Sequence, residues 1–445
     1  MSKRRKIIYQ PSRKLAPKCL PADLEPMAKD LYEKSCKGSY PLWDKIKSDP
    51  KSFINNDELK NYFLKLTYNG MKAAQEQMVN YILNVDKLDY STEVLFRSIA
   101  DSMGWMMIQN QLCYARALYQ EQRQPDLFNS NLESVFAAAN SIMDEDSLSF
   151  ALISDLTSFI QLGDIYLSSS SKGSCVIEVK SGENNHKLMN FLFNAKNDNQ
   201  PFENDSENLS FKDIKQMERI MRQTNRMSHY TRLVNKGVSS HPDTKMIHKI
   251  PNEEVFVESW LDDFIEVLNG NKVKDWSIGV IDDYIFVGSY TGKKALHMGH
   301  LIFNNWFDVS GGTPNCPRVL LNDSMIDPLA PPVFALDIPE EDKFDVVFGR
   351  KTVCIGIVVD EFLKRCEKEG LTVRFATNKE KGKLLQSKHR PYMHKGMPVY
   401  IGNGINEMVL MEGIFLRTLH HYERPISIIK HYLNDPELFE QRFVD

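Results

Sequence analysis

Three residues near the middle of the chain, Asp164, Glu178 and Lys180, have the types and spacing that metal-assisted hydrolysis of a phosphate ester needs. Alternate residues of a β-strand share a face, so Glu178 and Lys180 are expected to point the same way. Two carboxylates held close together repel each other, and a divalent cation with oxygen ligands, such as Mg²⁺ or Mn²⁺, relieves that repulsion. Such an ion activates a bound water and neutralises charge on a phosphate, while the lysine stabilises the transition state.

The segments that carry these residues predict a β-hairpin. Residues 157–167 and 174–181 are rich in β-branched and aromatic residues, and a polar tract separates them. If the turn is centred on Ser171, Asp164 lies directly opposite Glu178, with Cβ atoms about 4.5–5.5 Å apart. Asp155 is the alternative acid. We favour Asp164, because Gly163 and its apolar neighbours suit a strand that bends toward a site.

A helix predicted from about Phe211 to Val234 follows this hairpin after a polar loop, and it carries a basic stripe. Apolar residues recur along it and are expected to share one face: Ile214, Met217, Ile220, Met221 and Met227. Basic residues recur every three or four positions, with Gln216 and Gln223 beside them: Lys215, Arg219, Arg222 and Arg226. The stripe is suited to contacting a phosphate backbone, and the alternative is a solvated cationic face.

The order of these elements resembles the PD-(D/E)xK phosphodiesterase superfamily, the restriction-endonuclease-like nucleases. The resemblance covers about residues 130–235, and Gly163 stands at the position of the family's nominal proline. It implies that Asp164 and Glu178 hold the metal and that Lys180 completes the catalytic centre. It also implies a further carboxylate, Glu133, in the helix before the sheet. The residues that it implies for substrate binding lie on the following helix: Gln216, Arg219, Lys215 and Arg222.

The function implied by this resemblance is Mg²⁺- or Mn²⁺-dependent hydrolysis of nucleic acid, with DNA favoured over RNA. Bacterial proteins that join such a core to other regions often serve in phage defence or restriction, an analogy by fold alone. The alternative is a catalytically inactive nuclease fold that acts as a nucleic-acid-binding or scaffold module.

A separate motif, His297-Met-Gly-His300, resembles the His-x-Gly-His sequence of nucleotidylyl-transferring enzymes, which opens a helix at a phosphate site. No lysine-rich partner motif follows it. An ordinary turn and helix start is the favoured interpretation.

Composition limits the partners and the compartment. The 445 residues carry a formal net charge of −4, so nucleic acid would have to be met by a local basic patch. Seven cysteines without a CxxC pair indicate reduced thiols and a cytoplasmic protein. No apolar run approaches the roughly 18 residues of a membrane span, so no membrane association is expected. The composition is compatible both with binding to a protein partner and with self-association.

The chain is expected to be α/β (mixed α+β) and to fall into four parts. These are a basic N-terminal arm (1–20), a helical region (21–125), the nuclease core (126–237) and a C-terminal α/β domain of unknown role (250–445). The core is expected to hold a mixed sheet flanked by helices. In the last part, strands are predicted over 276–287, 345–348 and 352–357, and a helix over 408–422.

Overall fold

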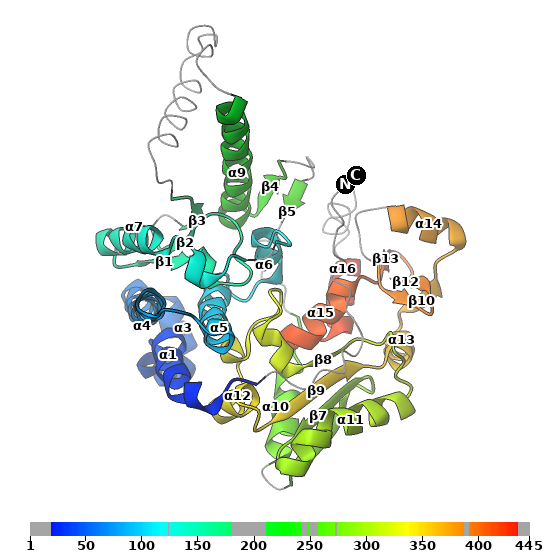
Figure 1. Ribbon diagram of the computed structural model, residues 1–445. Coiled ribbons are helices and arrows are strands. Elements are labelled where there is room, and N and C mark those ends of the chain that lie inside the picture. The colour runs from blue at the N-terminus through cyan, green and yellow to red at the C-terminus, as the bar shows by residue number, and fades with distance from the viewer. Residues whose placement is uncertain are drawn as a thin grey trace. The chain divides into compact units, whose positions relative to one another are not determined.

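The computed structural model describes residues 19–122, 124–171, 173–179, 211–242, 247–249, 257–271, 274–386 and 391–434 (Figure 1). The chain divides into two compact units, one of residues 27–252 and the other of residues 1–26 together with 253–445. Every ladder between described strands is antiparallel. The protein is therefore of mixed helix and sheet, as expected, but the mixed sheet predicted for the core is wrong for the described strands.

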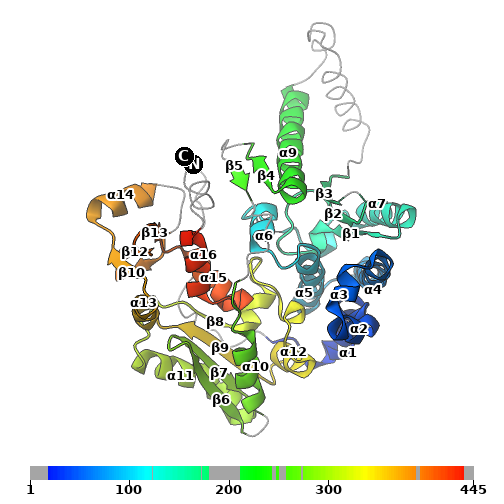
Figure 2. The ribbon, with the colours of Figure 1, turned by 180° about the vertical axis from the view of Figure 1, so that it is seen from behind.

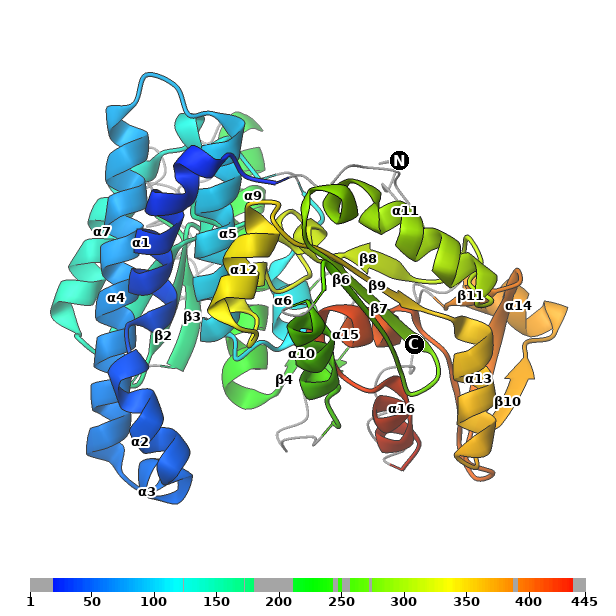
Figure 3. The same ribbon diagram turned by 90° about the horizontal axis from the view of Figure 1, so that it is seen from below.

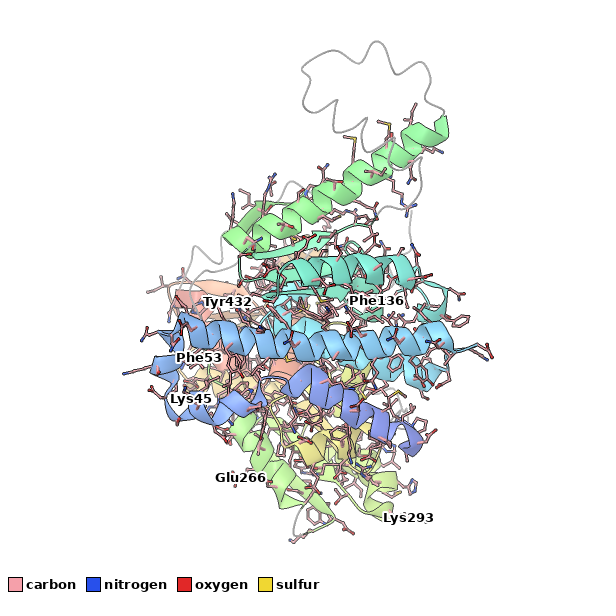
Figure 4. All side chains as sticks on the ribbon, turned by 90° about the vertical axis from the view of Figure 1, so that its left-hand side faces the viewer. Lys45, Phe53, Phe136, Glu266, Lys293 and Tyr432 are labelled. Atoms are coloured by element: carbon pink, nitrogen blue, oxygen red, sulfur yellow. The ribbon has the colours of Figure 1, made fainter. Side chains whose placement is uncertain are left out.

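Helices dominate the first part of unit 27–252. Their bounds are α1 (Glu25–Lys37), η2 (Tyr40–Leu42), α2 (Trp43–Ser48), α3 (Pro50–Ile54), α4 (Asp57–Asn84), α5 (Tyr90–Met107), α6 (Leu112–Leu118), η3 (Leu127–Asn129) and α7 (Leu132–Glu145). Side chains cap the two long helices, because Asn56 accepts the N–H of Leu59 and Asp89 that of Thr92. Figure 4 shows the side chains of this unit, with Phe53 labelled on α3.

A three-stranded sheet follows, in the order β1 (Ser149–Ile153), β2 (Ile165–Ser169) and β3 (Gly173–Ile177). Helix α7 packs along β1, and α9 (Phe211–Lys236) packs along β3 (Figure 1). The edge of β1 is covered by α4, where the buried Gln75 donates to Ala151 O at 3.0 Å and accepts from Ile153 N at 2.9 Å. The short strands β4 (Val238–Ser240) and β5 (Ile247–Lys249) pair with each other.

The predicted hairpin is confirmed, register included. Ile165 lies opposite Ile177 and Ser169 opposite Gly173, so the turn is centred on Ser171. The first predicted strand is too long, however. Residues between β1 and β2 form a short 3₁₀ turn, η4 (Ser154–Leu156), and a bend, and β2 begins only at Ile165.

The unit of residues 1–26 and 253–445 is built around a four-stranded sheet in the order β6-β7-β9-β8. The strands are β6 (Trp276–Ile281), β7 (Ile285–Tyr290), β9 (Thr352–Ile357) and β8 (Arg318–Leu320). Helix α11 (Lys293–Val309) covers one face, and α10 (Leu261–Gly270) and α15 (Glu412–His421) cover the other (Figure 3).

A smaller ladder in the same unit pairs β12 (Met397–Gly402) with β10 (Thr372–Phe375), β11 (Met393–His394) and β13 (Glu407–Val409). The remaining elements are η1 (Ala22–Leu24), η6 (Leu321–Met325), η7 (Val333–Ala335), α12 (Glu340–Val347), α13 (Val359–Lys368), α14 (Asn378–Gln386) and α16 (Pro425–Asn434).

Three predictions for this unit are wrong. The strand expected over 276–287 is a hairpin, because Asp282 and Asp283 take positive φ values, 53° and 71°, between β6 and β7. The strand expected over 345–348 is the end of α12. This helix begins after Pro339, and three acidic residues in its first turn favour it. The helix expected over 408–422 begins at Glu412, after β13.

No helix among the described residues is long and apolar enough to cross a membrane.

Candidate functional site

Three segments meet at one end of the three-stranded sheet. Where β1 ends, Ser154 N donates to Asp164 O at 2.9 Å, and Asp164 N donates to Ile177 O, also at 2.9 Å. The turn after β1, the start of β2 and the end of β3 are thus bonded side by side. We call this region the acidic sheet end, because these segments carry Asp155, Asp164 and Glu178.

The regular ladder ends at the pair of Ile165 and Ile177, and Asp164, whose N–H donates to Ile177 O at 2.9 Å, lies beside the end of β3. Gly163 makes this placement sterically feasible. Its φ is +66°, and a Cβ at this position would lie 2.4 Å from Val176 Cγ1. A larger residue would force β2 away from β3, so the glycine allows the chain to enter the strand beside Val176.

The carboxylate of Asp164 is turned toward the end of β3. Its Oδ2 accepts the backbone N–H of Val179 at 2.6 Å, and the side chain is half-buried. A carboxylate that accepts a backbone N–H is fixed in direction but keeps its negative charge. The main chain that follows Glu178 therefore fixes the direction of the Asp164 carboxylate.

Glu178 is half-buried and contacts helix α9. Its Oε1 accepts from Gln223 Nε2 at 3.3 Å. Gln216, which the sequence assigns to substrate binding, is also half-buried and lies two helical turns before Gln223 on the same side of α9. The contact of Gln223 with Glu178 does not follow from periodicity, because it depends on where α9 crosses β3.

Asp155, the acid that we set aside on sequence grounds, lies at the same sheet end. Burial raises its pKa, Arg97 lowers it, and the charge of Glu178 raises it further. Asp155 is thus within electrostatic reach of Glu178. At this sheet end, burial is therefore the main reason that the Asp155 carboxyl resists ionising.

Hydrogen bonds from helix α5 hold the turn that carries Asp155 in place. Arg97 Nη1 donates to the carbonyls of Asp155 and Thr157, both at 2.9 Å, and Arg97 pairs with Glu93 at 2.8 Å. One helical turn later, Asp101 accepts from Ser158 N at 2.7 Å and from Ser158 Oγ at 2.6 Å. Asp101 is fully buried, and that burial raises its pKa to about 7.

Glu133 lies in the first turn of α7 with its side chain exposed, and none of the contacts described above includes it. Its role as a further carboxylate stays a prediction. Lys180 falls outside the described residues, as does the basic arm up to residue 18.

The basic stripe of α9 lies on the outer surface of the helix. Lys215, Arg219 and Arg222 are exposed, whereas Arg226 is half-buried. The apolar face was predicted only in part. Ile220 is buried, but Ile214 and Met221 are 45% and 51% exposed. Figure 1 shows why, because the N-terminal part of α9 extends past the three strands.

The donor set at the acidic sheet end consists of hard carboxylate oxygens. Among the described residues, no group of three or more His, Cys, Asp or Glu side chains is arranged to hold a metal ion. Mg²⁺ is commonly bound by one or two carboxylates together with water and substrate phosphates. Glu178 together with Asp164 or Asp155 would therefore supply the type and number of carboxylate ligands that Mg²⁺ commonly uses.

The His297–His300 motif lies inside α11 rather than at its start, which is at Lys293. His297 is exposed. Gly299 is buried against Tyr290, and a Cβ there would lie 2.6 Å from the Tyr290 ring. Close packing of α11 on β7 accounts for the glycine without a nucleotide.

Comparison with known protein families, with curated proteins and with solved structures finds no match to this chain. Functional conclusions therefore depend on the residues and their arrangement.

Proposed function

We propose that the protein is a metal-dependent nuclease of PD-(D/E)xK type and that the acidic sheet end is its catalytic centre. The observation that supports this most is that the segments carrying Asp155, Asp164 and Glu178 are hydrogen-bonded side by side at one end of a sheet. Asp155 adds a third acid at that end, within electrostatic reach of Glu178.

In this proposal each residue has its own task. Asp164 and Glu178 hold Mg²⁺ or Mn²⁺, whose chemistry is to activate water and neutralise phosphate charge. The N–H of Val179 and the amide of Gln223 orient the two carboxylates. Lys180, two residues beyond Glu178, stabilises charge on the phosphate that is attacked.

The substrate proposed is nucleic acid, with DNA favoured over RNA. The exposed residues Lys215, Arg219 and Arg222 supply a local cationic surface on a chain of net negative charge. Each phosphate that they neutralise would release counterions and make binding weaker at higher salt. A role in bacterial phage defence or restriction is part of this proposal and depends on analogy of fold alone.

A cleavage assay tests the proposal. Purified protein would be incubated with plasmid, linear duplex, single-stranded DNA and RNA in Mg²⁺, Mn²⁺ or EDTA. Lys180→Ala would be compared with Lys172→Ala, which changes a lysine eight residues earlier in the sequence. We expect metal-dependent cutting that Lys180→Ala abolishes and Lys172→Ala leaves intact.

Two results would overturn the nuclease assignment. Equal cutting by Lys180→Ala and wild type would point to a contaminating nuclease. Binding of nucleic acid without cutting in any metal would favour the alternative, an inactive nuclease fold that serves as a binding module.

A further inference from the structure

The four-stranded sheet of unit 1–26 and 253–445 has an apolar edge strand. Among the described strands, β6 pairs only with β7 (Figure 2). Three alternate residues of β6, Trp276, Ile278 and Val280, are 48%, 42% and 47% exposed. Apolar side chains on an unpaired edge favour association with another strand.

The exposed residues belong to the face of the sheet that α11 covers farther in. Ile278 lies opposite Gly288, and a Cβ at Gly288 would lie 2.9 Å from Phe303 of α11. Helix α11 thus shields β7 while the same face of β6 stays open. The shielding ends one strand short of the sheet edge.

Helix α11 itself extends this open surface. Arg318 of β8 contacts Asn304 and Asp308, which places that flank of α11 on the β8 side. Met298 and Ile302 lie on the opposite flank, toward β6, and both are exposed. We call Trp276, Ile278, Val280, Met298 and Ile302 the β6 patch.

Strand β1, an edge strand of the other unit, is treated differently. In unit 27–252 the edge of β1 is covered by α4, and Gln75 bonds to its main chain on both sides of Leu152. Strand β6 is longer than β1, and it has no proline or charged residue within it. Both devices normally protect an exposed edge.

We propose that β6 pairs with β6 of a second copy of this chain, antiparallel about a twofold axis at Ile278. Opposed residues of an antiparallel pair share a face. The apolar residues of β6 are symmetric about Ile278, so Ile278 meets Ile278 of the second copy and Trp276 meets Val280. An aromatic residue opposite a β-branched one is a favourable cross-strand pair.

The charges that flank β6 fit the same register. Lys274, whose ammonium lies 5.6 Å from the centre of the Trp276 ring, would lie opposite Asp282 of the second copy, whose carboxylate also pairs with Arg424 of its own chain. Asp283, next along the chain, is close to the same point. The twofold axis makes this contact twice, once at each end of the paired strands, and a parallel pairing would bring like charges together instead.

The oligomeric state of the full chain in solution tests this pairing. Sedimentation equilibrium would compare wild type with Ile278→Lys and with Ile326→Lys, whose parent residue is 44% exposed outside the β6 patch. We expect a dimer in the wild type and in Ile326→Lys. Ile278→Lys should raise the dissociation constant by at least about tenfold, because two ammonium groups would be directly opposed.

A second measurement fixes the register. Ile278→Cys should be joined to its own copy by a short bismaleimide, with the bridge mapped to residue 278 by mass spectrometry, while Ile326→Cys should not. This test holds even if Ile278→Lys folds poorly. A wild type that stays monomeric at about 100 µM, a concentration far above typical dimer dissociation constants, would overturn the proposal. So would a dimer that Ile278→Lys leaves unchanged. The outcome is independent of nuclease activity, because β6 belongs to the other unit.

Discussion

The two units hold their buried acids in different ways. In the unit of residues 1–26 and 253–445, Asp342 is buried and pairs with the buried ammonium of Lys351. In unit 27–252, Asp101 is equally buried but accepts its hydrogen bonds from Ser158. Burial raises the pKa of Asp101 to about 7, although the hydrogen bonds from Ser158 and the charge of Arg97 lower it.

The same contrast separates the acids that follow strands. Beyond β6, Asp282 pairs with the guanidinium of Arg424, which also binds Asp263 at 2.6 Å. At the acidic sheet end, Asp164 accepts a main-chain N–H and Glu178 accepts the amide of Gln223. The first arrangement joins elements of the fold. The second fixes the direction of two carboxylates at the end of a sheet.

The largest effect is expected from Glu178→Gln, which keeps the size of the side chain and removes its charge. We expect metal-dependent cleavage to fall about 100-fold or more, because an oriented charge at the reacting centre is lost. Asp283→Asn, in the other unit, is the matched control, since its carboxylate pairs with Arg365 at 3.4 Å. Initial cleavage rates measure both, and equal losses in the two variants would remove the distinction between the units.

Lys351→Ala should destabilise its unit by about 3–5 kcal/mol, because the carboxylate of Asp342 would stay buried without its cation. Replacing both residues, as Lys351→Met with Asp342→Leu, should recover most of that loss. Urea unfolding followed by tryptophan fluorescence measures the free energies. A loss below about 1 kcal/mol, the value typical of an exposed pair, would show that the pair does not cancel a buried charge.

Asp101→Asn should change how stability depends on pH. The folded pKa of Asp101, about 7, lies above its unfolded value of about 3.9, so between these values the folded chain binds the extra proton. Stability contributed by this group is therefore lost as pH rises through that window. Relative to wild type, the variant should gain about 2 kcal/mol between about pH 5 and pH 7.

The difference in free energy of unfolding between wild type and Asp101→Asn, measured by urea titration at each pH, tests this sign. A difference that stays constant across the window would mean that Asp101 does not titrate there. Glu93→Gln, two turns earlier on α5 and paired with Arg97, serves as a comparison for general charge loss on this helix.

The smallest effect is expected from the two glutamines of α9. Gln223→Ala should lower cleavage about tenfold, because residues that orient a metal ligand commonly contribute 10–100-fold. Gln216→Ala should have less effect, since the described contact with Glu178 comes from Gln223. The reverse order would mean that Gln223 does not orient Glu178 and that Gln216 contributes more, as a substrate-binding residue.

The hairpin could be predicted from sequence because all its information is local. A polar tract between two β-rich segments fixes the centre of the turn, and the register then follows by counting from Ser171. The helices at 132–145 and 211–236 also follow from local periodicity.

The rest depends on contacts between distant segments. Asp155 lies at the acidic sheet end because a 3₁₀ turn follows β1 there, and Arg97 of α5 bonds to that turn. A contact between such distant residues leaves no local sequence pattern. Which glutamine of α9 contacts Glu178 depends on where this helix crosses β3. The exposure of Ile214 depends on how far α9 extends past the sheet, which periodicity cannot supply.

Binding of Mn²⁺ to the acidic sheet end, measured by electron paramagnetic resonance without nucleic acid, tests the central claim most directly. We predict saturable binding that Mg²⁺ competes away, that Glu178→Gln and Asp164→Asn abolish, and that Asp283→Asn leaves unchanged. Wild-type protein that binds no Mn²⁺, or binding that survives both substitutions, would contradict the claim that these carboxylates form a metal site.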